Sequence, residues 1–278
     1  MTPSTYSLVA FDAARLEWGV VVQSKFLAIG ALTPWAEPGV GAIATQSWIE
    51  VRYGRDGLRL LCEGASADEA LDVLTAADAG REKRQVGVVD RSGRAASFTG
   101  SECAEWAGGR VGEGYAAQGN LLVSEATVDA LAETFEMTAG RALAERLLAA
   151  LAAGQAAGGD RRGLQAAALR VVRAGAGYGG SGIVVDLRVD DHPDPIVELE
   201  RLYRLHDLYF GETPRRSWIP ATDELLQRVR RRLGELGFDT CDLLANLDAW
   251  AGYENLEERL DGVESFDPVL LSELLDAR

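Results

Sequence analysis

Hydroxyl-bearing side chains gather near the start of the chain, in the stretch "TYSLVAFDAARLEWGVVVQSKF". Thr5 and Ser7 fall in the first apolar run, and Ser24 and Lys25 end the second. A serine or threonine hydroxyl attacks a carbonyl only when a neighbouring base or a lowered pKa activates it. The pattern therefore indicates a hairpin that either carries a nucleophile with an activating lysine or shows ordinary strand chemistry.

The composition excludes several classes of protein. The chain has 278 residues, 47% of them hydrophobic, and a formal net charge of -15. Such a charge argues against binding to a phosphate backbone or to an anionic membrane surface, so we expect neither nucleic acid nor membrane as a partner. The cysteines (Cys62, Cys103 and Cys241) form no CxxC pair, so we expect no zinc site and no disulfide framework. We expect no cofactor.

The first residues, "MTPSTYS", contain no basic leader followed by an apolar run. The apolar runs of the chain are shorter than the roughly 18 residues that indicate a membrane span. The expected location is therefore cytoplasmic.

The predicted elements run in the order strands, helices, strands, helices, strands and a final helix. Strands are expected at 5–11, 18–22, 26–32, 41–48, 84–90, 94–100, 168–172 and 183–189, and helices at 53–63, from Ser66, around 128–135, around 143–151 and at 194–209. Ser66 with Glu69 has the spacing of a capping box. Strand groups on both sides of helix pairs predict sheet packed on sheet with helices outside, and the absence of βαβ alternation disfavours a parallel sheet.

A linker is expected in "FGETPRRSWIP", because it combines two prolines, a glycine and polar residues. The predicted domains are therefore residues 1–212 and 213–278. Leucine-rich stripes at helical spacing follow the linker, at 225–236, 243–247 and 269–275. They predict a compact helical module without strands, too small to bury much surface alone. We expect it to act as an oligomerisation element, giving a homo-oligomer, or as a cover over a cleft.

Several motifs together resemble a known bacterial family. They are "TYSLVAFD", "GVVVQSKFLAIGALTPWAEPGVGAIATQ", "RQVGVVDRSGRAASFTG", "GYAAQGN", "AGQAAGGDRRGLQAAAL" and "VDLRVDDHPDP". In this order, over about residues 5–210, they resemble domain of unknown function 1028, which is grouped with the N-terminal nucleophile (Ntn) hydrolases. The resemblance implies an α+β fold, a four-layer αββα sandwich of two antiparallel sheets between helices. Residues 214–278 resemble a small all-α domain described as peptidoglycan-binding.

Ntn hydrolases use the first residue of the mature chain as nucleophile and its own α-amine as base. The resemblance places Thr5 at the nucleophile position and Lys25 where it would lower a neighbouring pKa or hold an anion. Thr5 is not the first residue of this sequence. Either the chain is cleaved before Thr5, or the hydroxyl acts without a free amine, or the protein catalyses no acyl transfer.

Further polar residues are candidates for substrate binding. Thr45 and Gln46 end a predicted strand and could face a ligand or only satisfy backbone groups. Gln118 and Asn120 flank a glycine, and a side-chain amide there could donate to an oxyanion or belong to a turn before a helix.

Two acidic segments leave alternatives open. In "GQAAGGDRRGLQ", Asp160 would favour an amine and Gln165 would bind beside it, unless the segment is a plain loop before a strand. Asp190, Asp191 and His192 are weak candidates for a divalent cation, but the following Asp-Pro pair also has the pattern of a helix start. We expect no metal.

The resulting hypothesis is an Ntn-type hydrolase acting on an amide bond of a small molecule. The first alternative is a small-molecule-binding protein with the same fold and no turnover. The second is a cell-wall-associated binding protein that acts through the C-terminal domain, for which no secretion signal is visible.

Overall fold

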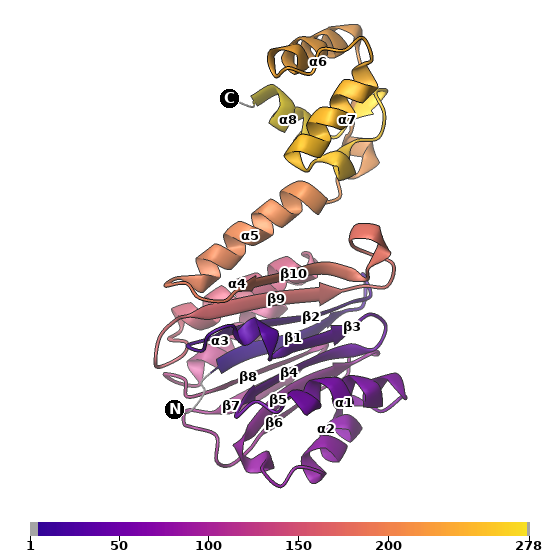
Figure 1. Ribbon diagram of the computed structural model, residues 1–278. Coiled ribbons are helices and arrows are strands. Elements are labelled where there is room, and N and C mark those ends of the chain that lie inside the picture. The colour runs from indigo at the N-terminus through magenta and orange to yellow at the C-terminus, as the bar shows by residue number, and fades with distance from the viewer. Residues whose placement is uncertain (1–4, 277–278) are drawn as a thin grey trace. The chain divides into compact units, whose positions relative to one another are not determined.

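The computed structural model describes residues 5–276 and shows a mixed fold of helices and antiparallel sheets (Figure 1). The chain divides into two compact units, Met1–Leu202 and Tyr203–Arg278. The division falls inside helix α5 (Pro195–Phe210), whereas the expected boundary lies just after this helix. Among the described residues, no helix is both long and apolar enough to cross a membrane.

The larger sheet has six strands in the order β10-β9-β2-β1-β8-β7, and every pairing in it is antiparallel. Its strands are β1 (Thr5–Asp12), β2 (Glu17–Ser24), β7 (Gly108–Gly112), β8 (Tyr115–Asn120), β9 (Ala166–Val172) and β10 (Ile183–Val189). The predicted pairing of the first two strands is confirmed, because Leu8 lies opposite Val21 and Val9 opposite Val20. Strand β1 is therefore central, with β2 on one side and β8 on the other.

The smaller sheet has four strands in the order β3-β4-β5-β6. They are β3 (Pro34–Glu37), β4 (Gly41–Ser47), β5 (Arg84–Asp90) and β6 (Ala95–Thr99). Helices α1 (Val51–Cys62) and α2 (Ala67–Ala76) cover one face, where Ile43, Val86 and Val88 pack against their apolar side chains. The predicted capping box of Ser66 and Glu69 is confirmed at the start of α2.

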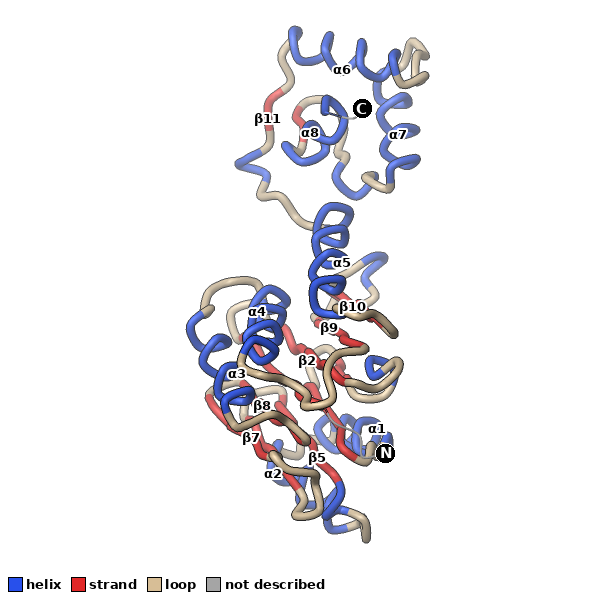
Figure 2. The backbone as a smooth tube through the Cα atoms, turned by 90° about the vertical axis from the view of Figure 1, so that its left-hand side faces the viewer, coloured by secondary structure: helices blue, strands red, loops and turns tan. Residues whose placement is uncertain are grey.

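Helices α3 (Ala126–Met137) and α4 (Leu143–Ala156) pack on one face of the larger sheet (Figure 2). The other face meets the smaller sheet, and Val9, Trp18 and Val20 pack there against residues of β4 and β5. Side chains alternate between the two faces of a strand, so every second residue of β1 lies between the sheets. This alternation decides which polar residues can meet.

Among residues 5–276, three short 3-10 helices lie in the connections of the first unit and two in the second. They are η1 (Ile29–Ala31), η2 (Arg81–Lys83), η3 (Tyr178–Gly180), η4 (Arg215–Ser217) and η5 (Glu257–Arg259).

The strand expected at 26–32 is wrong. Ala28 has a left-handed backbone (φ 53°), its N–H donates to the Asp190 carbonyl, and η1 follows. The segment "FLAIGAL" shows no alternation of polar and apolar residues, so its pattern does not distinguish a strand from a buried turn. The strand lies instead at β3, where Pro34 is tolerated because it is the first residue of an edge strand.

The glycine-rich passage before α3 also differs from expectation. A turn at Gln118 and Asn120 was one of two alternatives, and the structure excludes it because both residues lie in β8, which pairs with β1 and β7. Glycines at 108, 109 and 112 lie in the edge strand β7, where glycine weakens but does not prevent pairing.

The second unit contains α6 (Asp223–Glu235), α7 (Leu243–Glu254) and α8 (Pro268–Asp276) around an apolar core that includes Leu233, Leu247 and Trp250. The expectation of a module without strands is wrong in one detail. Strand β11 (Ile219–Pro220) pairs with β12 (Ser265–Phe266) in a short antiparallel ladder. This ladder joins the segment before α6 to the segment before α8.

A buried ion pair stabilises this unit and gives a prediction. Arg259 donates to Asp267 over 2.9 Å, and the two side chains are only 4% and 2% exposed. Asp267→Asn keeps an acceptor for the Val269 N–H but leaves the guanidinium without its counter-charge. Because an uncompensated buried charge is costly, we expect a loss of about 3 kcal/mol in the free energy of unfolding. Urea titration followed by circular dichroism measures it.

The control is Asp261→Asn, which removes the charge of an exposed ion pair with Arg215. Exposed pairs contribute less than about 1 kcal/mol, so this variant should have nearly the same free energy of unfolding as the parent protein. Equal losses in the two variants would contradict the structural role of the buried pair.

Candidate functional site

A row of buried polar side chains crosses the larger sheet at the start of β1. The Thr5 hydroxyl donates to the Ser24 hydroxyl of β2 over 3.2 Å. On the other side, Thr5 lies opposite Asn120 of β8, and the Asn120 amide is 3.5 Å from the Thr5 carbonyl. All three residues are fully buried. Three neighbouring strands thus bring a hydroxyl, a second hydroxyl and an amide into one solvent-free row.

Two glutamines of the smaller sheet face this row. The Gln46 amide donates to the Thr5 carbonyl over 3.3 Å and to the Gln85 carbonyl oxygen over 2.8 Å. The Asn120 amide donates to the same Gln85 oxygen over 2.9 Å. The Gln85 amide in turn donates to the Thr99 hydroxyl at 2.9 Å and to the Gly119 carbonyl at 2.8 Å. Gln85 therefore connects both sheets.

The row and the two glutamines together form a polar cluster, and Ser7 extends this cluster one step along β1. Its hydroxyl donates to the Gln46 carbonyl oxygen over 2.6 Å and accepts from the Gln118 amide over 2.6 Å. In the described part of the chain, Gln118 Oε1 has no hydrogen-bond partner. It lies against Gly87, where a Cβ atom would come within 2.1 Å of it. The backbone of β5 approaches Gln118 this closely only because residue 87 has no side chain.

The alternation of side chains explains why these polar residues meet. Thr5, Ser7 and Val9 point between the sheets from β1, so this face is polar at one end and apolar at the other. Buried polar groups are stable when they bond to one another, because a lost hydrogen bond in a dry interior is expensive. Polar side chains on six strands, β1, β2, β4, β5, β6 and β8, supply those partners here.

Lys25 and Asp160 mark the edge of this cluster. Asp160 is 3% exposed and accepts from the Lys25 N–H over 2.8 Å and from the Arg162 guanidinium over 3.1 Å. The Lys25 ammonium is exposed and donates to the Leu164 carbonyl over 2.9 Å. Within residues 5–276, no hydrogen bond joins this ammonium to Thr5. The structure thus brings Asp160, but not the lysine charge, to the end of β2.

Tyr6 points to the opposite face of β1, where its hydroxyl donates to Gln155 over 3.3 Å. Burial, together with the negative charge of Asp160, raises the pKa of Tyr6 well above its usual value. The phenol therefore stays protonated at neutral pH and acts as a hydrogen-bond donor.

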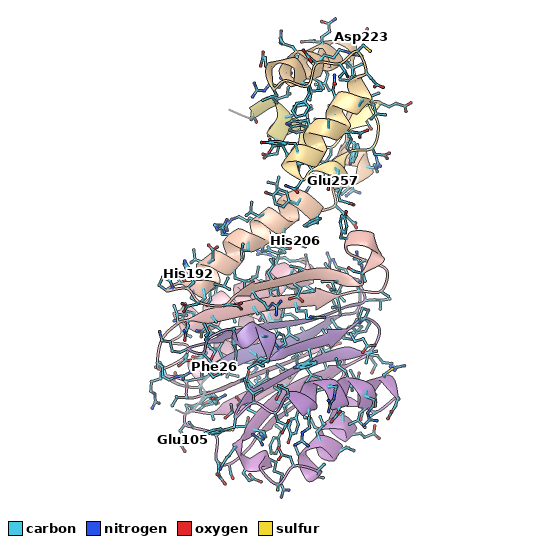
Figure 3. All side chains as sticks on the ribbon, viewed as in Figure 1. Phe26, Glu105, His192, His206, Asp223 and Glu257 are labelled. Atoms are coloured by element: carbon cyan, nitrogen blue, oxygen red, sulfur yellow. The ribbon has the colours of Figure 1, made fainter. Side chains whose placement is uncertain are left out.

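Other residues suggested by the sequence lie apart from the cluster. Thr45 points to the face opposite Gln46, and its hydroxyl donates to the Glu50 carbonyl before α1. Gln165 donates to Asp191 at the surface. His192, labelled in Figure 3, precedes α5 and accepts from the Asp194 N–H over 3.0 Å. Asp190 contributes its backbone carbonyl to Ala28. No group of three metal-ligating side chains occurs among the described residues.

The sequence interpretation missed Gln85 and assigned Ser7 and Ser24 to ordinary strand roles. A signal for Gln85 exists in "RQVGVVD", where alternation puts Gln85, Gly87 and Val89 on one face. A glutamine there predicts a buried polar partner across the sheet. The small size of Gly87 on the same face indicates close approach by another side chain.

Comparison with known proteins agrees with the earlier resemblance. A model of a family of unknown function, DUF1028, matches residues 5–199, which is more than half of the chain. The chain belongs to the DUF1028 family. The match contains every residue of the polar cluster and ends before the second unit. The resemblance of residues 214–278 to a peptidoglycan-binding domain therefore stays a prediction, as does a homo-oligomer.

A crystal structure of another DUF1028 protein, SPO2555 from Silicibacter pomeroyi, is similar to this chain. The two share 29% sequence identity with a TM-score of 0.67, over 76% of this chain and 95% of that one. Among curated proteins, none matches the sequence. The comparisons thus establish the family of this chain.

The central position of Gln85 gives a stability prediction. Gln85→Met keeps the length of the side chain but leaves the buried amides of Gln46 and Asn120 without their shared acceptor. Each buried polar group without a partner costs about 1–3 kcal/mol, so we expect a loss of at least about 3 kcal/mol in the free energy of unfolding. Chemical denaturation checks this value.

The matched control is Gln165→Met, the same change at a partly exposed glutamine that bonds to Asp191. A surface substitution of this kind should shift stability by about 0.5 kcal/mol or less. If Gln85→Met lowered the free energy of unfolding as little as Gln165→Met does, the cluster would contribute little to the stability of the fold.

Proposed function

We propose that this DUF1028 protein is an Ntn-type hydrolase that cleaves an amide bond of a small molecule, with Thr5 as nucleophile. One observation carries the proposal. The Thr5 hydroxyl lies at the start of the central strand β1, bonded to Ser24, with the side-chain amides of Gln46 and Asn120 at its own carbonyl. An oriented hydroxyl on a residue that also has fixed amide donors beside it suits covalent acyl transfer.

The layer order supports the same proposal. Helices α1 and α2 pack on the smaller sheet, the two sheets face each other, and α3 and α4 pack on the larger sheet. This order supports the αββα sandwich that the family resemblance implies. In that fold the nucleophile is expected at the N-terminal end of a central strand, which is the place of Thr5.

The proposed reaction begins with cleavage of the chain before Thr5, which gives Thr5 a free α-amine. The amine takes the hydroxyl proton as Thr5 Oγ1 attacks the substrate carbonyl, and a tetrahedral oxyanion forms. The carbon–nitrogen bond then breaks, the leaving amine receives that proton, and an ester to Thr5 remains. Water, deprotonated by the same α-amine, attacks the ester and releases the acid and the threonine hydroxyl. An amine with a pKa of about 8 suits both proton transfers.

Asn120 is the proposed donor to the oxyanion. It lies directly opposite Thr5 in the neighbouring strand, and its amide is held by Gln85 at 2.9 Å. A donor that is already oriented costs no reorganisation when charge develops on the substrate oxygen. Ser24 is a positioning residue, because its oxygen accepts the Thr5 hydroxyl and orients it.

A second candidate function is a small-molecule-binding protein without turnover. The observation that favours it is the complete burial of Thr5, which is 0% exposed. A hydroxyl without access to solvent reaches no substrate unless the end of β1 opens. For a chain that begins at Thr5, the hydrolase proposal predicts turnover of an amide, whereas the binding-protein alternative predicts none.

The test compares two proteins, one beginning at Met1 and one produced with Thr5 as its first residue. Both are assayed against a panel of small amides for release of amine. We expect turnover only from the second protein, because only this form has the α-amine at residue 5. In that form Thr5→Val should lower turnover by about 1,000-fold or more, while Thr5→Ser keeps part of it.

Thr99→Val is the matched control, since it removes another threonine hydroxyl from the same cluster without touching Thr5. It should keep most of the turnover. Equal activity in the two starting proteins would exclude the Thr5 amine as base. Ligand binding without turnover in both would support the binding protein instead.

A further inference from the structure

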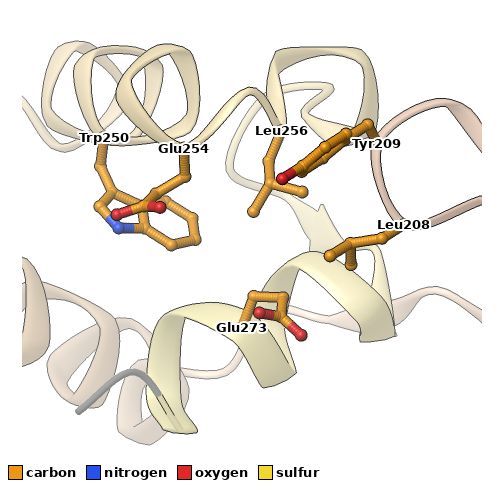
Figure 4. A pocket seen from close by; sticks show the side chains of 6 residues that line it. All are labelled: Leu208, Tyr209, Trp250, Glu254, Leu256 and Glu273. Atoms are coloured by element: carbon orange, nitrogen blue, oxygen red, sulfur yellow. The ribbon is translucent and has the colours of Figure 1, made fainter. Parts of the chain in front are cut away.

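A small pocket lies within the second unit, where the end of α5 meets α7 and α8 (Figure 4). Its volume is about 140 Å³. The side chains that line it are apolar or aromatic, with two carboxylates: Leu208, Tyr209, Trp250, Glu254, Leu256 and Glu273. None of the lining residues is basic. The pocket is therefore lined by both apolar and polar surface and is negatively charged.

Buried hydrogen bonds hold the wall that α5 contributes. The Arg259 guanidinium donates to the backbone carbonyls of Asp207 and Leu208 in the last turn of α5. It also donates to the Thr213 hydroxyl over 3.1 Å, and its charge is balanced by Asp267. Carbonyls at a helix end need such donors because they have no partner within the helix. Leu208 and Tyr209 are thus fixed in place, and Arg259 adds no net charge.

Trp250 supplies an unused donor. Its side chain is in the core of the unit, with only 2% of the residue exposed. Within the described residues, the indole N–H has no hydrogen-bond partner. An indole can only donate, and a buried donor without an acceptor is unfavourable. This N–H is closed off from solvent, so Trp250 lines the pocket with its ring and not with its donor.

The two carboxylates are also unused. Glu254 follows Trp250 by four residues on α7, so both lie on the same side of that helix, and both line the pocket. Glu273 comes from α8. In the described part of the chain, neither glutamate has an ion-pair or hydrogen-bond partner. Carboxylates and the faces of Trp and Tyr rings attract the same kind of ligand, a cation.

We propose that this pocket binds a small organic cation. The cationic group lies near Glu254 and Glu273 and against the aromatic rings. Its carbon atoms contact the leucines. This binding needs no processing at Thr5, so it is independent of the proposed hydrolase activity.

The experiment uses the full chain, beginning at Met1, and calorimetric titration with choline. Choline combines a quaternary ammonium with a hydroxyl oxygen. Its neutral carbon isostere, dimethylbutanol, has the same shape without the charge. We expect choline to bind with a Kd of about 1 mM or tighter and the isostere to bind at least about tenfold more weakly.

Variants locate the site. The double substitution Glu254→Gln and Glu273→Gln keeps the shape of the side chains and should weaken choline binding by at least about tenfold. Asp248→Asn removes a negative charge from an exposed residue of α7 that does not line the pocket, and it should change the affinity by less than about twofold.

Three results would overturn the proposal. One is no choline binding by the parent chain at about 10 mM, which is well above the expected Kd. Another is equal affinity for choline and the isostere, since the positive charge of the ligand would then contribute nothing to binding. The third is that Asp248→Asn weakens choline binding as much as the double substitution does, which would indicate a general effect of the negative charge of the chain. The isostere comparison needs no substitution, so it decides the matter even if the double variant fails to fold.

Discussion

The first unit depends on the hydrogen bonds that Gln85 makes between the two sheets. Its carbonyl oxygen accepts from Gln46 and Asn120, and its amide donates to the Gly119 carbonyl. Apolar contacts hold the sheets together at the other end, around Trp18. Apolar packing tolerates small shifts, whereas a fully buried hydrogen bond has a narrow range of lengths and angles. The polar end therefore sets how the two sheets align.

This alignment also explains the position of Thr5. Its carbonyl accepts from Gln46 and its hydroxyl donates to Ser24, so both ends of the residue are oriented by neighbours. Such preorganisation is useful to a nucleophile, and it equally suits a polar core residue. Among the described residues, each unit keeps a buried polar atom without a hydrogen-bond partner. Gln118 Oε1 is one in the first unit, and the Trp250 N–H is one in the second.

Sequence patterns predicted the central hairpin, the helix starts and the antiparallel pairing, because alternation and capping are local signals. They failed at 26–32, where an apolar run without alternation forms a turn bonded to Asp190. They also failed at β8, where glycines looked like turn residues although Gln118 and Asn120 pair with β1. Of the site, Thr5 came from the family resemblance and Asn120 from its place beside a glycine. Gln85 was missed, since its role depends on partners from four other strands.

Gly87 has a consequence for how this chain can vary. A Cβ atom at residue 87 would come within 2.1 Å of the Gln118 side chain, so the two positions share one small volume. An alanine at 87 would force the Gln118 amide to move away from its present place beside Ser7, and a shorter residue at 118 would not reach Ser7. Substitutions at 87 and 118 are therefore coupled, and a designer who changes one position must redesign the other together with the Ser7 contact.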